Sequence, residues 1–237
     1  MSSQSPILID QMSNITSIQK KQDCILFQGL LGERKIFGKA LSAEREDLMA
    51  AITDEYHTMK DISHPMVPHY YGITAPFCPD GNKEYKAVIS DYINGTTLLR
   101  ASEDLSWREI LAMVTPVIGL LGFLKDRGLV YTDLNPGNII ISPAGHLYLV
   151  DYTGAWYYRR TPSPTYRLRF SYRPDPSLPG DRLLIQETAL MLEDLFDNKK
   201  EGSLLPSCVY ALLETGLHPS SSLSLKDYQQ MIRNCLR

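Results

Sequence analysis

Three oxygen-bearing side chains flank a stretch that reads as a β-hairpin: Asp133, Asn138 and Asp151. Two short apolar runs, 138–142 and 146–150, are rich in Ile, Leu, Val and Tyr and are joined by a Pro-Ala-Gly turn, which is typical of two paired strands. Such pairing would place the three side chains at one end of the hairpin. Carboxylate and amide oxygens are the ligands that Mg²⁺ accepts when it also binds the phosphates of a nucleotide. The stretch therefore predicts a site for a magnesium-nucleotide complex.

The segments around these residues resemble two motifs of the protein kinase superfamily. Residues 133–138, Asp-Leu-Asn-Pro-Gly-Asn, are similar to the catalytic loop, and residues 151–154, Asp-Tyr-Thr-Gly, are similar to the metal-binding Asp-Phe-Gly segment. The resemblance implies that Asp133 is catalytic and orients the attacking hydroxyl, while Asn138 and Asp151 bind the metal. It also implies ATP and Mg²⁺ as cofactors.

A lysine and a glutamate nearer the start of the chain fit the same family. Lys39 lies within the apolar run 34–41, where a lone lysine would ordinarily point to solvent. Residues 42–62 follow with helical periodicity, and Glu55 lies in the latter half of that segment. In protein kinases the strand lysine pairs with a glutamate at this place and contacts the α and β phosphates. The resemblance therefore assigns nucleotide binding to Lys39 and Glu55, and a catalytic role to Lys39.

The predicted adenine site depends on backbone atoms. Residues 87–98 resemble the fifth strand and hinge of protein kinases. By this resemblance Ser90 lies beside the adenine pocket, and the backbone of Asp91 and Ile93 hydrogen-bonds the base. Ordinary strand residues would give the same pattern, because main-chain atoms do the binding.

Two departures from the family pattern affect the expected activity. The turn at 19–23 has no glycine, although backbone amides normally approach the phosphates closely there. Lys20 and Lys21 either supply charge at this place or are simply solvated, and the sequence leaves both alternatives open. Thr132 stands where the family has an arginine that pairs with a phosphorylated activation loop. The catalytic loop is therefore expected to be competent without loop phosphorylation.

A basic and aromatic segment, residues 156–173, follows the metal-binding motif and resembles the kinase activation segment. It either docks an acidic or phosphorylated protein substrate through charge-assisted hydrogen bonds or is a solvated loop. Its arginines are Arg159, Arg160, Arg167, Arg169 and Arg173. Its candidate autophosphorylation sites are Thr161, Ser163 and Thr165. Residues 172–175 are similar to the closing Ala-Pro-Glu of that segment, with Asp175 in place of the glutamate.

The remaining patterns predict an α+β, two-lobed protein kinase-like fold that forms one kinase domain. Residues 1–14 are expected to be a flexible leader, 15–93 a small antiparallel β-sheet N-lobe, and 94–237 a reduced, mainly α-helical C-lobe. Strands are predicted over 15–19, 24–31, 34–41 and 84–93. Helices are predicted over 106–127, 181–196, 206–217 and 225–236, the first of them opened by a capping box. By the resemblance, Asp181 braces the catalytic loop from behind.

Composition limits the class of protein. The chain has 237 residues, 43% of them hydrophobic, and a net charge of −3, so charge gives no general attraction to nucleic acid or membranes. Its four cysteines are scattered, and reduced thiols are expected. The polar start has no signal-peptide pattern, and no membrane span is expected. A cytoplasmic location is expected, and export into a host cell without a cleaved signal stays open.

The function expected from these patterns is an ATP- and Mg²⁺-dependent protein kinase that transfers the γ-phosphate to Ser or Thr hydroxyls. The small size and the missing arginine look similar to bacterial effector kinases. Two alternatives remain open. One is a small-molecule or carbohydrate kinase, since the Pro-Gly-Asn triplet at 136–138 also occurs in that class. The other is a pseudokinase that acts as a binding module, since the phosphate turn has no glycine.

Overall fold

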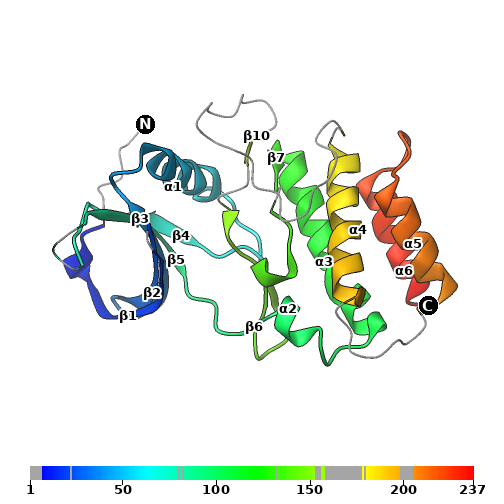
Figure 1. The fold of residues 1–237 in the computed structure, drawn as a ribbon, viewed down its shortest axis with the longest axis horizontal. Coiled ribbons are helices and arrows are strands. Elements are labelled where there is room, and N and C mark those ends of the chain that lie inside the picture. The colour runs from blue at the N-terminus through cyan, green and yellow to red at the C-terminus, as the bar shows by residue number, and fades with distance from the viewer. Residues whose placement is uncertain are drawn as a thin grey trace. The chain divides into compact units, whose positions relative to one another are not determined.

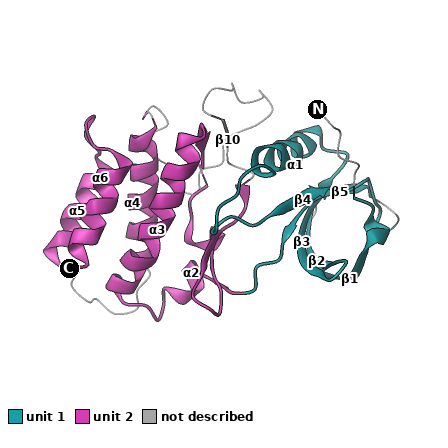
Figure 2. Ribbon diagram, turned by 180° about the vertical axis from the view of Figure 1, so that it is seen from behind, with its two compact units in different colours: residues 1–94, 162–167 teal, residues 95–161, 168–237 magenta. Residues whose placement is uncertain are grey.

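The computed structural model describes residues 7–21, 23–79, 81, 83–131, 133–152, 156–157, 178, 180–197 and 205–237. The chain forms two compact units, and the main division between them falls between Asn94 and Gly95 (Figure 2). The N-terminal unit is built on a β-sheet and the C-terminal unit mainly on helices (Figure 1). The predicted α+β class is therefore confirmed.

A five-stranded antiparallel sheet forms the N-terminal unit, with the strand order β1-β2-β3-β5-β4. Its strands are β1 (Met12–Lys21), β2 (Cys24–Leu31), β3 (Arg34–Ser42), β4 (Tyr70–Ile73) and β5 (Tyr85–Asp91). Helix α1 (Glu46–Met59) packs against β3, β4 and β5. This packing sets the helix beside the strand that carries Lys39.

Alternating side chains of the strands fill the core of this unit. The buried set is Met12, Ile25, Phe27, Ile36, Ala40, Tyr85, Ala87 and Ile89. Gly38 has a structural role here, because a Cβ at this position would lie 2.1 Å from Cζ of Phe27. The phenyl ring therefore covers the backbone of β3, one residue before Lys39.

Two predicted boundaries in this unit need correction. Strand β1 begins at Met12, and Ile7 forms a parallel bridge with Thr74, so residues 7–14 are not the flexible leader that was predicted. The residues around Met12 are mostly polar, so the sequence did not indicate that Met12 is buried. Helix α1 begins at Glu46 rather than at Ser42, because Ser42 is buried and pairs with Tyr85 as the last residue of β3.

Helices form most of the C-terminal unit, and α3 to α6 lie side by side in it (Figure 1). Its helices are α2 (Leu98–Ala101), α3 (Trp107–Asp126), α4 (Asp181–Asp197), α5 (Ser207–Leu217) and α6 (Leu225–Cys235). Its strands are β6 (Thr96–Thr97), β7 (Leu129–Val130), β8 (Ile139–Ile141), β9 (Leu147–Leu149) and β10 (Trp156–Tyr157). The predicted hairpin is present as β8 and β9, and the capping box of Ser106 and Glu109 opens α3.

Asp181, the first residue of α4, joins three helices. Its carboxylate accepts hydrogen bonds from Nζ of Lys125 on α3 and from the backbone N of Leu225 on α6, the latter at 3.1 Å. Among the residues that the structure describes, its partners thus lie on helices rather than in the catalytic loop. The carboxylate ties these helices together. Its role behind the catalytic loop stays a prediction, because Thr132 of that loop lies outside the described residues.

One described helix, α3, is long and apolar enough to cross a membrane by length and composition. No such run was expected from the sequence. Eight of its side chains, from Ile110 to Leu124, are buried within the unit, and Gln229 of α6 donates to its Thr115 carbonyl at 2.7 Å. These contacts are those of a core helix.

Candidate active site

The predicted catalytic loop is held in shape by its own asparagines. Pro136–Asn138 form a single 3₁₀ turn, and the side chain of Asn135 caps it by accepting from the backbone N of Asn138 at 3.1 Å. The Asn135 amide also donates to the Asp133 carbonyl at 3.2 Å. A side chain that bonds its own backbone in this way stabilises a turn. The backbone between Asp133 and Asn138 is therefore fixed.

Asn138 and Asp133 lie in contact. The Nδ2 of Asn138 donates to the Asp133 carbonyl at 3.0 Å, lies 3.4 Å from its Oδ2, and also donates to the Tyr131 hydroxyl at 3.2 Å. Three acceptors on one amide nitrogen fix the orientation of the amide. Its Oδ1 is directed elsewhere and makes no hydrogen bond within the described part of the chain. Such an oxygen is a suitable metal ligand.

Asp151 follows β9 in an unusual backbone conformation. Its φ is 60°, in the left-handed region that costs an L-residue about 1–2 kcal/mol. Asp tolerates this region better than most residues, and strained backbone of this kind is concentrated at functional sites. Such strain is consistent with a residue whose carboxylate has to be oriented toward a ligand.

Tyr131 connects the catalytic loop to the segment that carries Asp151. Its hydroxyl donates to the carbonyl of Val150 at 2.9 Å, while it accepts from Asn138. Its ring packs edge-on against Tyr152 with centroids 5.2 Å apart. Burial, with the charge of Asp151 as a smaller cause, raises the pKa of the Tyr131 phenol well above its usual value, so the hydroxyl stays protonated and donates. The sequence analysis assigned no role to Tyr131.

Tyr131→Phe tests this connection. The change leaves the partly buried Val150 carbonyl without this donor, which costs up to about 1–3 kcal/mol. We expect a lower unfolding temperature and phosphate transfer that is slower by about tenfold, because Asn138 also loses an acceptor that orients it. Thermal unfolding and initial rates measure the two effects. Tyr210→Phe, at an exposed tyrosine on α5, is the matched control. Wild-type values for both quantities in Tyr131→Phe would contradict the role of the hydroxyl.

Lys39 and Glu55 form the predicted pair within the N-terminal unit. The Nζ of Lys39 on β3 lies 3.7 Å from Oε2 of Glu55 on α1, and the side chains are only 14% and 3% exposed. The hydroxyl of Tyr70 on β4 donates to the other carboxylate oxygen, Oε1, at 2.9 Å. Buried charges persist in proteins when they are paired and hydrogen-bonded. Glu55 thus holds the lysine from one side, and Tyr70 is a support that the sequence analysis did not identify.

The predicted adenine-contacting residues lie at the end of β5. Ser90 is buried there. The Asp91 carboxylate accepts from the Tyr71 hydroxyl at 2.5 Å and from the His69 backbone N at 3.0 Å, and the Asp91 backbone N donates to the His69 carbonyl at 2.9 Å. Its side chain and amide are thus bonded to protein, so a base could use only its carbonyl. Ile93 follows the strand and is half-buried.

The oxygen donors of the C-terminal unit fit Mg²⁺. No group of three His, Cys, Asp or Glu side chains gathers among the described residues, so a site for a transition metal is not found there. Asp133, Asn138 and Asp151 offer carboxylate and amide oxygens, which are hard ligands. The oriented Oδ1 of Asn138 and the left-handed Asp151 are the structural features that agree with this donor set.

A buried glutamate was missed entirely by the sequence analysis. Glu187 lies on α4 with no exposed surface, and neither carboxylate oxygen has a hydrogen bond in the part of the chain that the structure describes. Burial and, as the smaller cause, the negative charge of Asp133 raise the pKa of its carboxyl to about 9. The group is therefore neutral at pH 7. On an amphipathic helix a glutamate is expected to face solvent, so the sequence pattern did not indicate its burial.

Several predicted features lie outside the described residues. These are Thr132, the arginines, the candidate phosphorylation sites and the closing 172–175 of the predicted activation segment. The backbone at the start of that segment is described, and there Trp156 and Tyr157 pair with Val130 and Leu129 as strand β10. The structure thus describes the predicted site residues in two sets, one in each unit. The N-terminal unit has Lys39, Glu55, Ser90, Asp91 and Ile93. The C-terminal unit has Asp133, Asn138 and Asp151.

Comparison with known proteins agrees with this geometry. The model of the protein kinase domain family matches residues 32–175, a range that includes Lys39, Glu55, Asp133, Asn138 and Asp151. The chain is 24% identical over 154 residues to the serine/threonine-protein kinase OXI1 of Arabidopsis thaliana, with 61% of the chain and 34% of OXI1 covered. It is 23% identical over 155 residues to the probable serine/threonine-protein kinase PknB of Lactococcus lactis, with 62% of the chain and 24% of PknB covered.

A third relative is the serine/threonine-protein kinase cek1 of Schizosaccharomyces pombe, at 36% identity over 76 residues that cover 30% of the chain and 6% of cek1. The chain thus spans about a third or less of the length of these curated relatives. The family match covers more than half of the chain and includes both sets of site residues. The chain therefore belongs to the protein kinase domain family, and the relatives that it resembles are serine/threonine kinases.

Proposed function

We propose that this chain is an ATP- and Mg²⁺-dependent protein kinase that transfers the γ-phosphate of ATP to Ser or Thr hydroxyls of a protein. The observation that carries the proposal is the buried pair of Lys39 and Glu55, with Tyr70 hydrogen-bonded to the glutamate. A lysine that is held by a nearly inaccessible carboxylate is a fixed positive charge, and this is what the α and β phosphates require. The serine/threonine class of the relatives supports the choice of acceptor.

Each residue has a distinct task in this mechanism. Asp133 accepts a hydrogen bond from the substrate hydroxyl and orients it for attack, since phosphoryl transfer depends mainly on positioning and electrostatics. Asn138 and Asp151 would hold Mg²⁺, which when bound neutralises phosphate charge. Tyr131 keeps Asn138 and Val150 in place. The order of the loop at Asn135 limits the motion of Asp133 and so preserves its alignment.

Labelled ATP tests the proposal. The wild-type chain is incubated with [γ-³²P]ATP and Mg²⁺, with and without a cell lysate, beside Asp133→Ala and Asp151→Ala. Label on Ser or Thr of proteins, lost in both variants, supports the protein kinase. Label on metabolites alone would indicate the small-molecule or carbohydrate kinase instead. No transfer by the wild type in any of these mixtures would overturn the proposal.

A second candidate, a pseudokinase that acts by binding, is favoured by one observation. The family match begins at residue 32, after the glycine-free turn between β1 and β2. In that case the wild type would bind a partner protein without transferring phosphate, and Asp133→Ala would bind the partner equally well.

The proposal extends to the substrate. An acidic or already phosphorylated protein would be attracted by the arginines of the segment 156–173, because a guanidinium makes bidentate, charge-assisted bonds to carboxylate and phosphate. A bacterial effector role inside a host cell is proposed by analogy with other small kinases. Phosphorylation of an acidic peptide faster than of a basic peptide with the same acceptor serine would support the first of these points.

Activity is expected to be independent of loop phosphorylation. Thr132 occupies the place of the arginine that pairs with a phosphorylated loop in other kinases, so a phosphate would have no partner at that position. We expect protein that is fully dephosphorylated by a phosphatase, with the phosphatase then removed, to retain at least about half of its rate. Intact mass confirms the absence of phosphate before the assay. Loss of activity that returns on autophosphorylation would contradict the expectation.

A further inference from the structure

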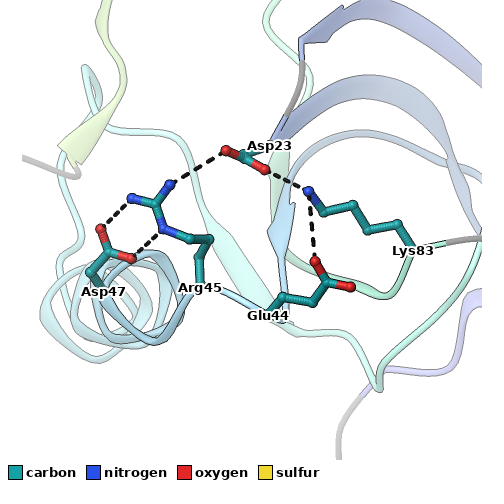
Figure 3. A network of polar contacts seen from close by, with 5 residues as sticks. All are labelled: Asp23, Glu44, Arg45, Asp47 and Lys83. Atoms are coloured by element: carbon teal, nitrogen blue, oxygen red, sulfur yellow. Dashed lines mark hydrogen bonds and ion pairs between the residues drawn. The ribbon is translucent and has the colours of Figure 1, made fainter.

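Five charged side chains form a network around the β1–β2 turn in the N-terminal unit (Figure 3). They are Asp23, Glu44, Arg45, Asp47 and Lys83. Asp23 lies at the centre, because its Oδ1 accepts from Nζ of Lys83 at 2.6 Å and its Oδ2 lies 3.4 Å from Nη1 of Arg45. Arg45 in turn donates to both carboxylate oxygens of Asp47, at 2.9 and 2.8 Å.

The network joins three separate segments of the unit. The strands β1 and β2 remain paired up to Lys21 and Cys24, so Asp23 lies in the short turn between them. Arg45 is the N-cap residue of α1, and Lys83 lies just before β5. The backbone strengthens the same connection, because the Asp23 carbonyl accepts from the backbone N of Ser42 at 3.0 Å. Asp23 is thus tied to the β3–α1 junction and to the start of β5.

The charges in this network are only partly buried. The side chains of Asp23 and Lys83 are 28% and 24% exposed, and that of Arg45 is 51% exposed. The hydrogen bond that Lys83 donates to Asp23 raises the pKa of the Lys83 amine, and the bonds that Arg45 donates to Asp47 raise the pKa of the Arg45 guanidinium. Ion pairs at this exposure contribute little to global stability. Their main effect is to restrict where the turn can lie.

This turn has no glycine in the place where protein kinases bring backbone amides to the phosphates. A glycine-rich loop adapts its backbone to the ligand, whereas this turn is fixed by side chains. Lys20 and Lys21 immediately precede it on β1 and are exposed. Fixing the end of the hairpin therefore also limits where these two cationic side chains can reach.

We propose that Asp23 is a positioning residue for nucleotide binding, and that its ion pairs with Lys83 and Arg45 hold the β1–β2 turn in the shape that receives the phosphates. This inference rests on the proposed function, because it assumes that the chain binds ATP. The inference adds to that function what takes the place of the missing glycines. The turn is held in place by Asp23, and the positive charge for the phosphates comes from Lys20 and Lys21.

The direction in which Asp23→Asn changes the KM for ATP distinguishes a positioning role from a purely electrostatic one. Asp23 is negative and adjoins the place proposed for an anion. If it acted only through its charge, Asp23→Asn would remove a repulsion, and the KM for ATP would fall. If it positions the turn, the same substitution releases the turn, and the KM rises although the local charge has become more favourable.

The experiment compares three variants under saturating protein substrate. Asp23→Asn and Lys83→Met are each expected to raise the KM for ATP by about three- to fivefold with kcat within about twofold. The double variant is expected to raise it no further than the larger single effect, because both changes break the same contact. Asp47→Asn is the matched control, since it removes an equal charge bonded to Arg45 but leaves Asp23 and Lys83 paired. Its KM is expected to stay within about 1.5-fold of the wild type.

A second readout does not require catalysis. Hydrogen exchange of peptides covering β1 and β2 in the nucleotide-free protein is expected to accelerate in Asp23→Asn and to stay unchanged in Asp47→Asn. An unchanged or lower KM in Asp23→Asn, in a wild type that is active, would overturn the positioning role while leaving the proposed function intact. A wild type that neither binds nor uses ATP would instead end the proposed function. In that case, exchange that is unchanged in Asp23→Asn would also rule out the ordered turn.

Discussion

Asp151→Asn is expected to lower the rate of phosphate transfer by about a thousandfold, while the protein stays folded. The carboxylate has two anionic oxygens for a metal, and the amide that replaces it has no charge and only one acceptor atom. Removing a charge that acts directly at the transferred phosphate has effects of about 10²–10⁴ in rate. Asparagine is the best substitute here, because Asp151 has a φ of 60° and asparagine tolerates that conformation.

Alanine at the same position would mix two effects. It would remove the ligand and also place a residue with poor left-handed propensity at a φ of 60°, so a loss of rate would not be assigned to the metal alone. The unfolding temperature of Asp151→Asn is expected to lie within a few degrees of the wild type. Asp104→Asn, at an exposed position after α2, controls for the loss of one charge. A fall in rate of less than about tenfold in Asp151→Asn would contradict the assignment of Asp151 as a metal ligand.

Glu187→Gln is expected to stabilise the protein at neutral and alkaline pH. The pKa of the Glu187 carboxyl is about 9 in the folded chain, against an ordinary value of 4.5. Because the folded state binds this proton more tightly than the unfolded state, the contribution of Glu187 to the free energy of unfolding is greatest below pH 4.5 and falls as the pH rises toward 9. The slope is about 1.4 kcal/mol per pH unit, so the loss at pH 7 is about 3 kcal/mol.

Urea unfolding at several values between pH 6 and 9 measures this effect. The wild type is expected to lose stability steadily across the range. Glu187→Gln, which cannot ionise, is expected to be more stable by about 3 kcal/mol at pH 7 and to show a flatter profile. Glu214→Gln, at an exposed position on α5, is the control and should follow the wild type. Equal slopes in the wild type and Glu187→Gln would show that Glu187 does not stay protonated in the folded protein.

Local patterns predicted much of the fold. The period-two apolar runs gave β2, β3 and the β8–β9 hairpin, and the Ser106–Glu109 capping box gave the start of α3. These features depend on residues within a few positions of one another, which is why a single sequence can show them. The start of α1 was wrong, because Ser42 looks like a helix cap but pairs across the sheet with Tyr85, a residue 43 positions away.

In the site, too, some features could be predicted from the sequence and others could not. Spacing and family resemblance identified Lys39, Glu55, Asp133, Asn138 and Asp151, and the structure brings Lys39 to Glu55 and Asn138 to Asp133. The adenine-contacting roles of Ser90, Asp91 and Ile93 remain predictions, as do the metal contacts.

The sequence by itself determined the kinds of element and the chemical groups of the site, because these depend on residue type and short-range order. Only the tertiary structure decided that Tyr131 bonds the carbonyl of Val150, that Tyr70 supports Glu55, and that Glu187 is buried on α4. A side chain's burial and hydrogen bonds are set by the segments that pack around it. Those segments are distant in the chain, so no local pattern records them.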